Sequence, residues 1–213
     1  MLELHYYPSN ASFAPHLLLE EMQLPYTLRK VNREAGEHKS AAYLKLNPNG
    51  LIPVLIDDGE PLYETAAILM HLADKAPGFA PPLGNMARAH YLKWMVWMTN
   101  TLQAMLIHYF YPERMVREGD AEAAAVVKSR AEAQVGPMLD QMEAELARHG
   151  GPWFGGASYS ALDPLAFMLC RWTRMHAHPA RARPLLGAYL ARVLARPATQ
   201  TVVAREGLPA PIF

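Results

Sequence analysis

The segment NPNGLIPVLIDDGE, residues 47 to 60, predicts a bend followed by a short strand and a turn. Its apolar run ends at Ile56 but carries Pro53 near its start. A proline lacks a backbone N–H and is therefore confined to a bend or an edge of a sheet. If the Ile52–Pro53 bond is cis, the main chain of Ile52 faces outward, where an extended peptide can pair with it. A trans proline that opens an edge strand is the alternative.

The residues on both sides of this segment predict an alternation of strands and helices. Apolar and polar residues alternate in the first residues, which indicates a strand, and helix formers follow behind Pro15. A second strand after that helix makes a right-handed, parallel βαβ unit. The predicted elements are a strand at 2–6, a helix at 15–24, a strand at 26–31, a helix at 40–46, a hairpin at 53–56 and 61–63, and a helix at 64–75.

A stretch rich in proline and glycine, KAPGFAPPLGN at 75–85, predicts a domain boundary. Beyond it the spacing of apolar residues is helical throughout. Gly136-Pro137 is expected to interrupt a long helical stretch at 120–149 and to produce a kink there. We therefore predict an α/β domain of order βαβαββα at residues 1–76, a linker at 77–85 and an all-helical domain at 86–213.

Composition excludes several classes of function. Lys plus Arg and Asp plus Glu number 20 each, so the basic surface expected of a nucleic-acid-binding protein is missing. No apolar run approaches the roughly 20 residues of a membrane span, and the N-terminus does not resemble a secretion signal. The single cysteine, Cys170, excludes an internal disulfide and a cysteine-rich metal site. We expect a cytoplasmic protein without a metal.

The stretch YETAAIL at 63–69 predicts a strand that runs directly into a helix. The N–H groups at a helix start bind carboxylates, and the Thr65 hydroxyl adds a donor. Glu64 can accept from an ammonium beside that carboxylate. An α-amino acid end carries both groups, so Glu64 and Thr65 suit the head of a γ-glutamyl peptide whose middle pairs with Ile52. A simple N-cap is the alternative for this pair.

Three motifs together resemble the cytosolic glutathione transferase superfamily: NPNGLIPVL, YETAAIL and SFAPHLLLEE at 12–21. The similarity covers essentially the whole chain and is strongest to bacterial beta-like and nu-like members. It implies that the first domain is thioredoxin-like and that Pro53 is cis. It also implies a glutathione site, and the residues that we assign to it are His38, Lys39, Leu51, Ile52, Pro53, Glu64 and Thr65. For His38 and Lys39, a solvated surface pair is the alternative.

The loop between the first strand and the first helix is the expected place for the glutathione thiol. A free thiol has a pKa of roughly 8.5, and a hydroxyl or amide that donates to sulfur near a helix start favours the thiolate. The resemblance places Ala11 where beta-type enzymes carry a cysteine, and Ser9 where nu-like and theta-like members use threonine or serine. Ser9 is therefore the first candidate, with Asn10 and Ser12 in reserve. Loop capping is the alternative for each.

Aromatic and basic residues near 110 are candidates for an acceptor pocket in the helical domain. They lie on the helix that the resemblance places beside the first domain, and His108 lies near an active-site histidine of beta-type relatives. An aromatic stripe at helical spacing is more often core. The candidates are His108, Tyr109, Tyr111 and Arg114.

Two further features predict structure and not chemistry. Ser160 and Asp163 have the spacing of a capping box, in which each side chain accepts from the backbone N–H of the other residue. Cys170 lies in an apolar helix and is expected to be a buried thiol.

The resemblance implies conjugation of the glutathione thiolate to small, largely apolar electrophiles. Glutathione is then a co-substrate, and a homodimer is expected. The alternatives are a glutathione-dependent disulfide reductase, peroxidase or isomerase, and a binding protein of this fold without turnover. The acceptor cannot be inferred from the residues.

Overall fold

The computed structural model describes all residues 1–213, which form two compact units. The first unit contains Met1–Ala80 and Val193–Ala210, and the second contains Pro81–Arg192 and Pro211–Phe213. The expected domain at 86–213 thus differs from the compact units, because residues 193–210 pack with the N-terminal part of the chain. The division into domains at 76 and 86 stays a prediction.

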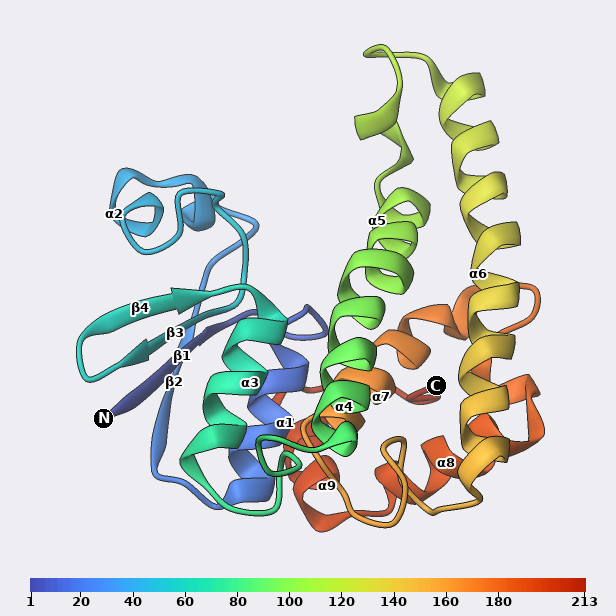
Figure 1. Ribbon diagram of the computed structural model, residues 1–213. Coiled ribbons are helices and arrows are strands. Elements are labelled where there is room, and N and C mark those ends of the chain that lie inside the picture. The colour runs from blue at the N-terminus through green and yellow to red at the C-terminus, as the bar shows by residue number, and fades with distance from the viewer. The chain divides into compact units, whose positions relative to one another are not determined.

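The first unit contains one mixed sheet of strand order β2-β1-β3-β4 (Figure 1). Strand β1 is parallel to β2 and antiparallel to β3, which is antiparallel to β4. This topology confirms the predicted thioredoxin-like βαβαββα order. The elements are β1 (Leu2–Tyr6), α1 (Phe13–Met22), β2 (Tyr26–Lys30), a 3-10 turn (Glu37–Lys39), α2 (Ala41–Leu44), β3 (Val54–Asp57), β4 (Glu60–Tyr63), α3 (Thr65–Lys75) and α9 (Pro197–Arg205).

Strand register brings three distant segments to the same end of this sheet. Val54, the first residue of β3, pairs with His5 near the end of β1 and with Tyr63 at the end of β4. The loop after β1, the Ile52–Pro53 bend and the start of α3 therefore leave the sheet side by side. This convergence positions the candidate site.

Helix α1 lies at the centre of the first unit. It packs against α3, α9 and β1, and its residues from Phe13 to Leu19 are all buried. The helix begins at Phe13, before the predicted start at Pro15. Burial on all sides explains why α1 is apolar around its circumference and not only along one stripe.

The second unit is helical, as predicted. A long helical segment comprises α4, a π-helical turn and α5, and no helix of the chain is both long and apolar enough to cross a membrane. The elements are α4 (Met86–Trp97), the π-helical turn (Met98–Gln103), α5 (Ala104–Phe110), α6 (Ala121–His149), α7 (Leu162–Trp172), α8 (Pro184–Leu194) and 3-10 turns at Pro112–Met115, Thr173–Met175 and Ala180–Ala182. Helix α6 continues through Pro137, so the expected interruption there is wrong, and the expected kink stays a prediction.

The start of α7 contains the predicted capping contact in part. The Ser160 N–H donates to the Asp163 carboxylate over 2.7 Å. The prediction that the Ser160 side chain accepts from the Asp163 N–H is wrong. The Ser160 hydroxyl accepts from the N–H of Leu162, and the Asp163 N–H donates to the Ser160 carbonyl. Asp163 is completely buried and also accepts from the Phe154 N–H and the Tyr189 hydroxyl. It therefore connects α7 to two other segments of the core.

Candidate active site

The Ile52–Pro53 peptide is cis, as predicted. The N–H and C=O of Ile52 make no hydrogen bond within the chain, whereas its side chain joins a buried cluster with Val31, Tyr43 and Val54. The carbonyl of Leu51 instead accepts from the Tyr43 hydroxyl over 3.0 Å. The side chain of Ile52 thus anchors the bend while its main chain remains available for an extended peptide.

The start of α3 presents donors toward the same end of the sheet. Glu64 is exposed, has a φ of 73° and makes no side-chain cap hydrogen bond. Thr65, the first residue of the helix, is buried. A non-glycine residue with positive φ is uncommon and is concentrated at functional sites. The simple N-cap is excluded for the Glu64 carboxylate, which leaves the first N–H groups of α3 without a side-chain acceptor.

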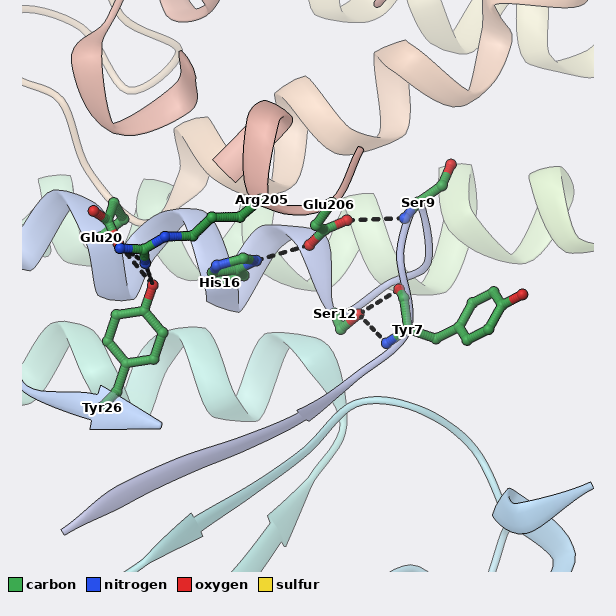
Figure 2. Close-up of polar contacts among 8 residues, drawn as sticks. All are labelled: Tyr7, Ser9, Ser12, His16, Glu20, Tyr26, Arg205 and Glu206. Atoms are coloured by element: carbon green, nitrogen blue, oxygen red, sulfur yellow. Dashed lines mark hydrogen bonds and ion pairs between the residues drawn. The ribbon is translucent and has the colours of Figure 1, made fainter. Parts of the chain in front are cut away.

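The loop after β1 contains all three candidates for the thiol contact. The Ser9 N–H donates to Glu206 over 2.9 Å, and its hydroxyl points away from that carboxylate (Figure 2). The Asn10 side-chain oxygen accepts from the N–H of Ala11. Ser12 is fully buried, and its hydroxyl accepts from the Tyr7 N–H and donates to the Tyr7 carbonyl. Ser12 therefore closes the loop.

Glu206 is a residue of this site that the sequence analysis missed. It lies just beyond the end of α9 and is 5% exposed, although it is a carboxylate. No motif marks it, because Glu206 and Ser9 are at opposite ends of the chain. In the sequence Glu206 is an isolated acidic residue, with no motif around it.

The segment with His38 and Lys39 follows β2 and packs against the segment before the bend. A Cβ on Gly50 would lie 2.8 Å from the His38 carbonyl oxygen, and Gly50 has a φ of 58°. Lys39 Nζ donates to the Asn49 carbonyl over 3.2 Å. Partial burial lowers the pKa of His38, and the nearby Lys39 and Arg33 lower it further. The Lys39 ammonium therefore lies beside residues 49 and 50, just before the Ile52 bend.

Two tyrosines at the end of β1 are poor sources of a phenolate. The Tyr7 hydroxyl donates to Glu34 over 2.7 Å, and this hydrogen bond raises the pKa of Tyr7. Burial, together with the negative charge of Glu206, raises the pKa of Tyr6. Hydroxyls of the loop remain the candidates for a donor to sulfur.

The structure places the four acceptor-pocket candidates at and just beyond the end of α5. Tyr109 is buried, and its ring centroid lies 4.1 Å from that of His176. The guanidinium of exposed Arg114 lies 4.0 Å from the Tyr111 ring centroid. His108 lies on the same helix and is half-buried. Tyr109 thus contributes to the core of the second unit, while Tyr111 and Arg114 form a stacked pair.

Cys170 is buried, and burial raises the pKa of its thiol to about 12. The expected structural role of this thiol agrees with its position inside α7. A thiol that does not ionise near neutral pH is a poor nucleophile.

Comparison with known proteins places these features in a family. The model of the glutathione S-transferase N-terminal domain matches residues 8–75. Glutathione S-transferase 3 of Zea mays is 34% identical over 208 residues, which cover 91% of this chain and 89% of that protein. The disulfide-bond oxidoreductase YfcG of Escherichia coli is 29% identical over 209 residues, which cover 93% of each chain.

A solved structure shows the same architecture. A glutathione transferase homologue from Sulfitobacter, with bound glutathione, has a TM-score of 0.87 and 26% identity, over 98% of this chain and 99% of that chain. The maize relative and the Sulfitobacter structure each match nearly the full length of this chain. The chain belongs to the glutathione S-transferase family.

Proposed function

We propose that the chain is a transferase that conjugates the thiolate of glutathione to small, largely apolar electrophiles. The observation that carries this proposal is the main chain of Ile52, which has no hydrogen-bond partner within the chain, together with the uncapped start of α3. Ile52 pairs with the cysteinyl part of the tripeptide. Glu64 accepts from the γ-glutamyl ammonium, and Thr65 and the first N–H groups of α3 donate to its carboxylate.

The other end of glutathione carries the glycine carboxylate. His38 and Lys39 lie on the side of the Ile52 bend where this group would extend, and Leu51 and Pro53 flank the paired residue. The Lys39 ammonium supplies a positive charge for this carboxylate, and an imidazole N–H of His38 supplies a further donor. No metal or further cofactor is required for these steps.

Ser9 is the proposed donor to the glutathione sulfur. Its hydroxyl favours the thiolate over the thiol, and each unit by which the thiol pKa falls requires about 1.4 kcal/mol of selective stabilisation. The thiolate then attacks an electrophilic carbon, a carbon–sulfur bond forms, and the leaving group departs with the bonding electron pair. Asn10 is the reserve candidate, and Ser12 ranks last because its hydroxyl proton is donated to Tyr7.

The acceptor is proposed to bind at the helical domain, residues 86–213. His108, Tyr109, Tyr111 and Arg114 offer apolar faces and one cation for an aromatic electrophile. We further propose a homodimer in the cytoplasm, where the glutathione pool is reducing.

Disulfide reduction by glutathione is the second candidate function. The similarity to YfcG, which is named a disulfide-bond oxidoreductase, favours it. Ala11 occupies the loop position at which a cysteine would permit a mixed disulfide between protein and glutathione. Reduction would therefore proceed through the glutathione thiolate alone, with a second glutathione as the reductant that releases the first.

Calorimetry with glutathione tests the shared basis of both functions, and the absence of heat at millimolar concentrations would refute them. Conjugation of an aryl halide supports the transferase, and reduction of hydroxyethyl disulfide supports the reductase. Ser9→Ala should lower turnover in either assay by about 100-fold, because it removes the donor to sulfur. Binding of glutathione with neither activity would indicate a non-catalytic member of the family.

A further inference from the structure

A buried carboxylate from the C-terminal segment contacts the loop that carries Ser9. One oxygen of Glu206 accepts from the Ser9 N–H over 2.9 Å, and the other lies 2.8 Å from Nδ1 of His16 on α1. The side chains of His16 and Glu206 are both fully buried. Figure 2 shows the carboxylate between the imidazole and the Ser9 backbone.

Burial of this carboxylate is unfavourable unless both oxygens have partners. Each oxygen has one, and one of the two partners is a main-chain N–H of the loop. Glu206 therefore holds the loop that carries Ser9 as well as His16 on α1. Ser9 also has a φ of 64°, a backbone conformation that non-glycine residues hold only where tertiary contacts fix it.

Two arginine side chains also hold α9 to the first part of the chain, without reaching the loop. Arg205 donates to Glu20 and to the Tyr26 hydroxyl, and Arg196 pairs with Glu21 through two hydrogen bonds. Arg205 immediately precedes Glu206, yet its contacts lie at the other end of α1 (Figure 2). Docking of α9 and positioning of the loop are thus assigned to different side chains.

We propose that Glu206 is a positioning residue for the glutathione reaction, acting through the Ser9 main chain. The carboxylate holds the Ser9 N–H from one side and leaves the hydroxyl directed away from it. His16 orients the carboxylate from the opposite side. This inference rests on the proposed role of Ser9.

The role predicts a particular kinetic signature. Glutathione is held by Ile52, Glu64 and Thr65, none of which contacts Glu206. Loss of the contact should therefore lower kcat and raise the pKa of the bound thiol, while KM for glutathione changes little. A small displacement of a reacting group lowers the rate by up to about 100-fold.

Four variants of the full-length protein test the inference. Glu206→Met keeps the volume but removes the acceptor. Glu206→Gln keeps an oxygen for the Ser9 N–H, and its amide N–H can donate to Nδ1 of the other His16 tautomer. Arg205→Ala is the matched control, because it weakens α9 docking beside an intact loop contact. Ser9→Ala tests the proposed function itself.

The measurements are kcat, KM for glutathione, the pH dependence of thiolate absorbance in the bound tripeptide, and the urea midpoint. We expect Glu206→Met to lose about 10- to 100-fold in kcat with KM within about 3-fold of wild type. Glu206→Gln should recover most of kcat, and Arg205→Ala should keep kcat and the thiol pKa of the wild type.

The possible outcomes separate the inference from the proposed function. Equal kinetics for Glu206→Met and Arg205→Ala, with Ser9→Ala inactive, would overturn the positioning role alone. If the wild type shows no glutathione binding or no activity, the proposed transferase function is overturned. If Glu206→Met does not fold, Glu206→Asp decides: its carboxylate is one methylene too short for both contacts, so an unchanged kcat and thiol pKa would contradict the inference.

Discussion

The starts of helices α3 and α7 use an acidic residue in opposite ways. Asp163 on α7 is buried, and its carboxylate accepts from the Phe154 N–H, the Ser160 N–H and the Tyr189 hydroxyl. Glu64 before α3 is exposed and makes no cap hydrogen bond. A carboxylate whose oxygens are saturated inside the protein stabilises the fold. An acidic residue that leaves a helix start uncapped leaves room for a ligand.

Asp163 and Glu64 also differ in backbone conformation. Asp163 lies inside the first turn of a regular helix, whereas Glu64 has a φ of 73°. Positive φ in a non-glycine residue costs of order 1 kcal/mol or more and persists where the surrounding structure fixes it. Stability is thus optimised at α7 and not at α3.

Removal of the buried carboxylate should have the largest effect. Asp163→Ala leaves the buried N–H groups of Phe154 and Ser160 without an acceptor, and the Tyr189 hydroxyl keeps only the backbone carbonyl of residue 163, at 3.3 Å. Each unsatisfied group costs about 1–3 kcal/mol. We expect the free energy of unfolding to fall by about 3 kcal/mol or more in urea titration. Asp120→Ala is the control. Asp120 accepts from the Ala123 N–H in an exposed hydrogen bond at the start of α6, so its loss should cost only about 1 kcal/mol. Equal losses of unfolding free energy in Asp163→Ala and Asp120→Ala would show that the buried carboxylate contributes no more than an exposed cap.

The pH dependence of stability should report the same carboxyl group. Burial raises the pKa of Asp163 to about 6, against the partly opposing donors from Phe154 and Ser160. Between about pH 4, the unfolded value, and about pH 6 the folded state therefore holds a proton that the unfolded state has lost. The contribution of Asp163 to stability is full below pH 4, declines as pH rises and is constant above about pH 6.

Urea titrations of wild type and Asp163→Asn across this range isolate the effect. The stability of wild type relative to Asp163→Asn should fall by about 2 kcal/mol from pH 4 to pH 6.5 and then stay level. A difference that does not change with pH would show that the carboxyl group does not titrate there.

At the start of α3 the expected effects are on binding. Glu64→Ala removes the acceptor for the glutathione ammonium and should weaken binding by about 10- to 100-fold, the loss expected for a hydrogen bond to a charged group. Glu64→Gly should weaken binding equally but raise the free energy of unfolding by up to about 1 kcal/mol, because glycine accepts positive φ. Calorimetry and urea titration measure the two quantities, and a stability loss in Glu64→Gly would contradict a binding role maintained against strain.

The smallest expected effect concerns the Thr65 hydroxyl. Thr65→Val has a similar shape but no donor, and should raise KM for glutathione by about 10-fold with little change in stability. Thr65→Ser keeps the donor and should remain within about 2-fold of wild type. If valine and serine behave alike, the N–H groups of α3 bind the carboxylate without help from the hydroxyl.

The positions of the main elements followed from local sequence. Alternating residues at 2–6 and the YETAAIL motif each depend on neighbouring residues only, so a strand and a helix start could be predicted. Ile52–Pro53, Glu64 and Thr65 were site candidates for the same reason, and their role in binding glutathione stays a prediction. Helix boundaries were less accurate, as at Phe13, because burial against other elements decides where a helix begins.

Tertiary structure alone decided which polar groups satisfy one another. The sequence pattern paired Asp163 with Ser160 but did not indicate Tyr189, and it gave no sign that Glu206 reaches Ser9. A buried carboxylate takes its partners from whichever donors packing brings within hydrogen-bond distance, regardless of their separation along the chain. The sequence therefore determined where the Ile52–Pro53 bend and the start of α3 lie, and packing of the C-terminal segment determined how the Ser9 loop is held.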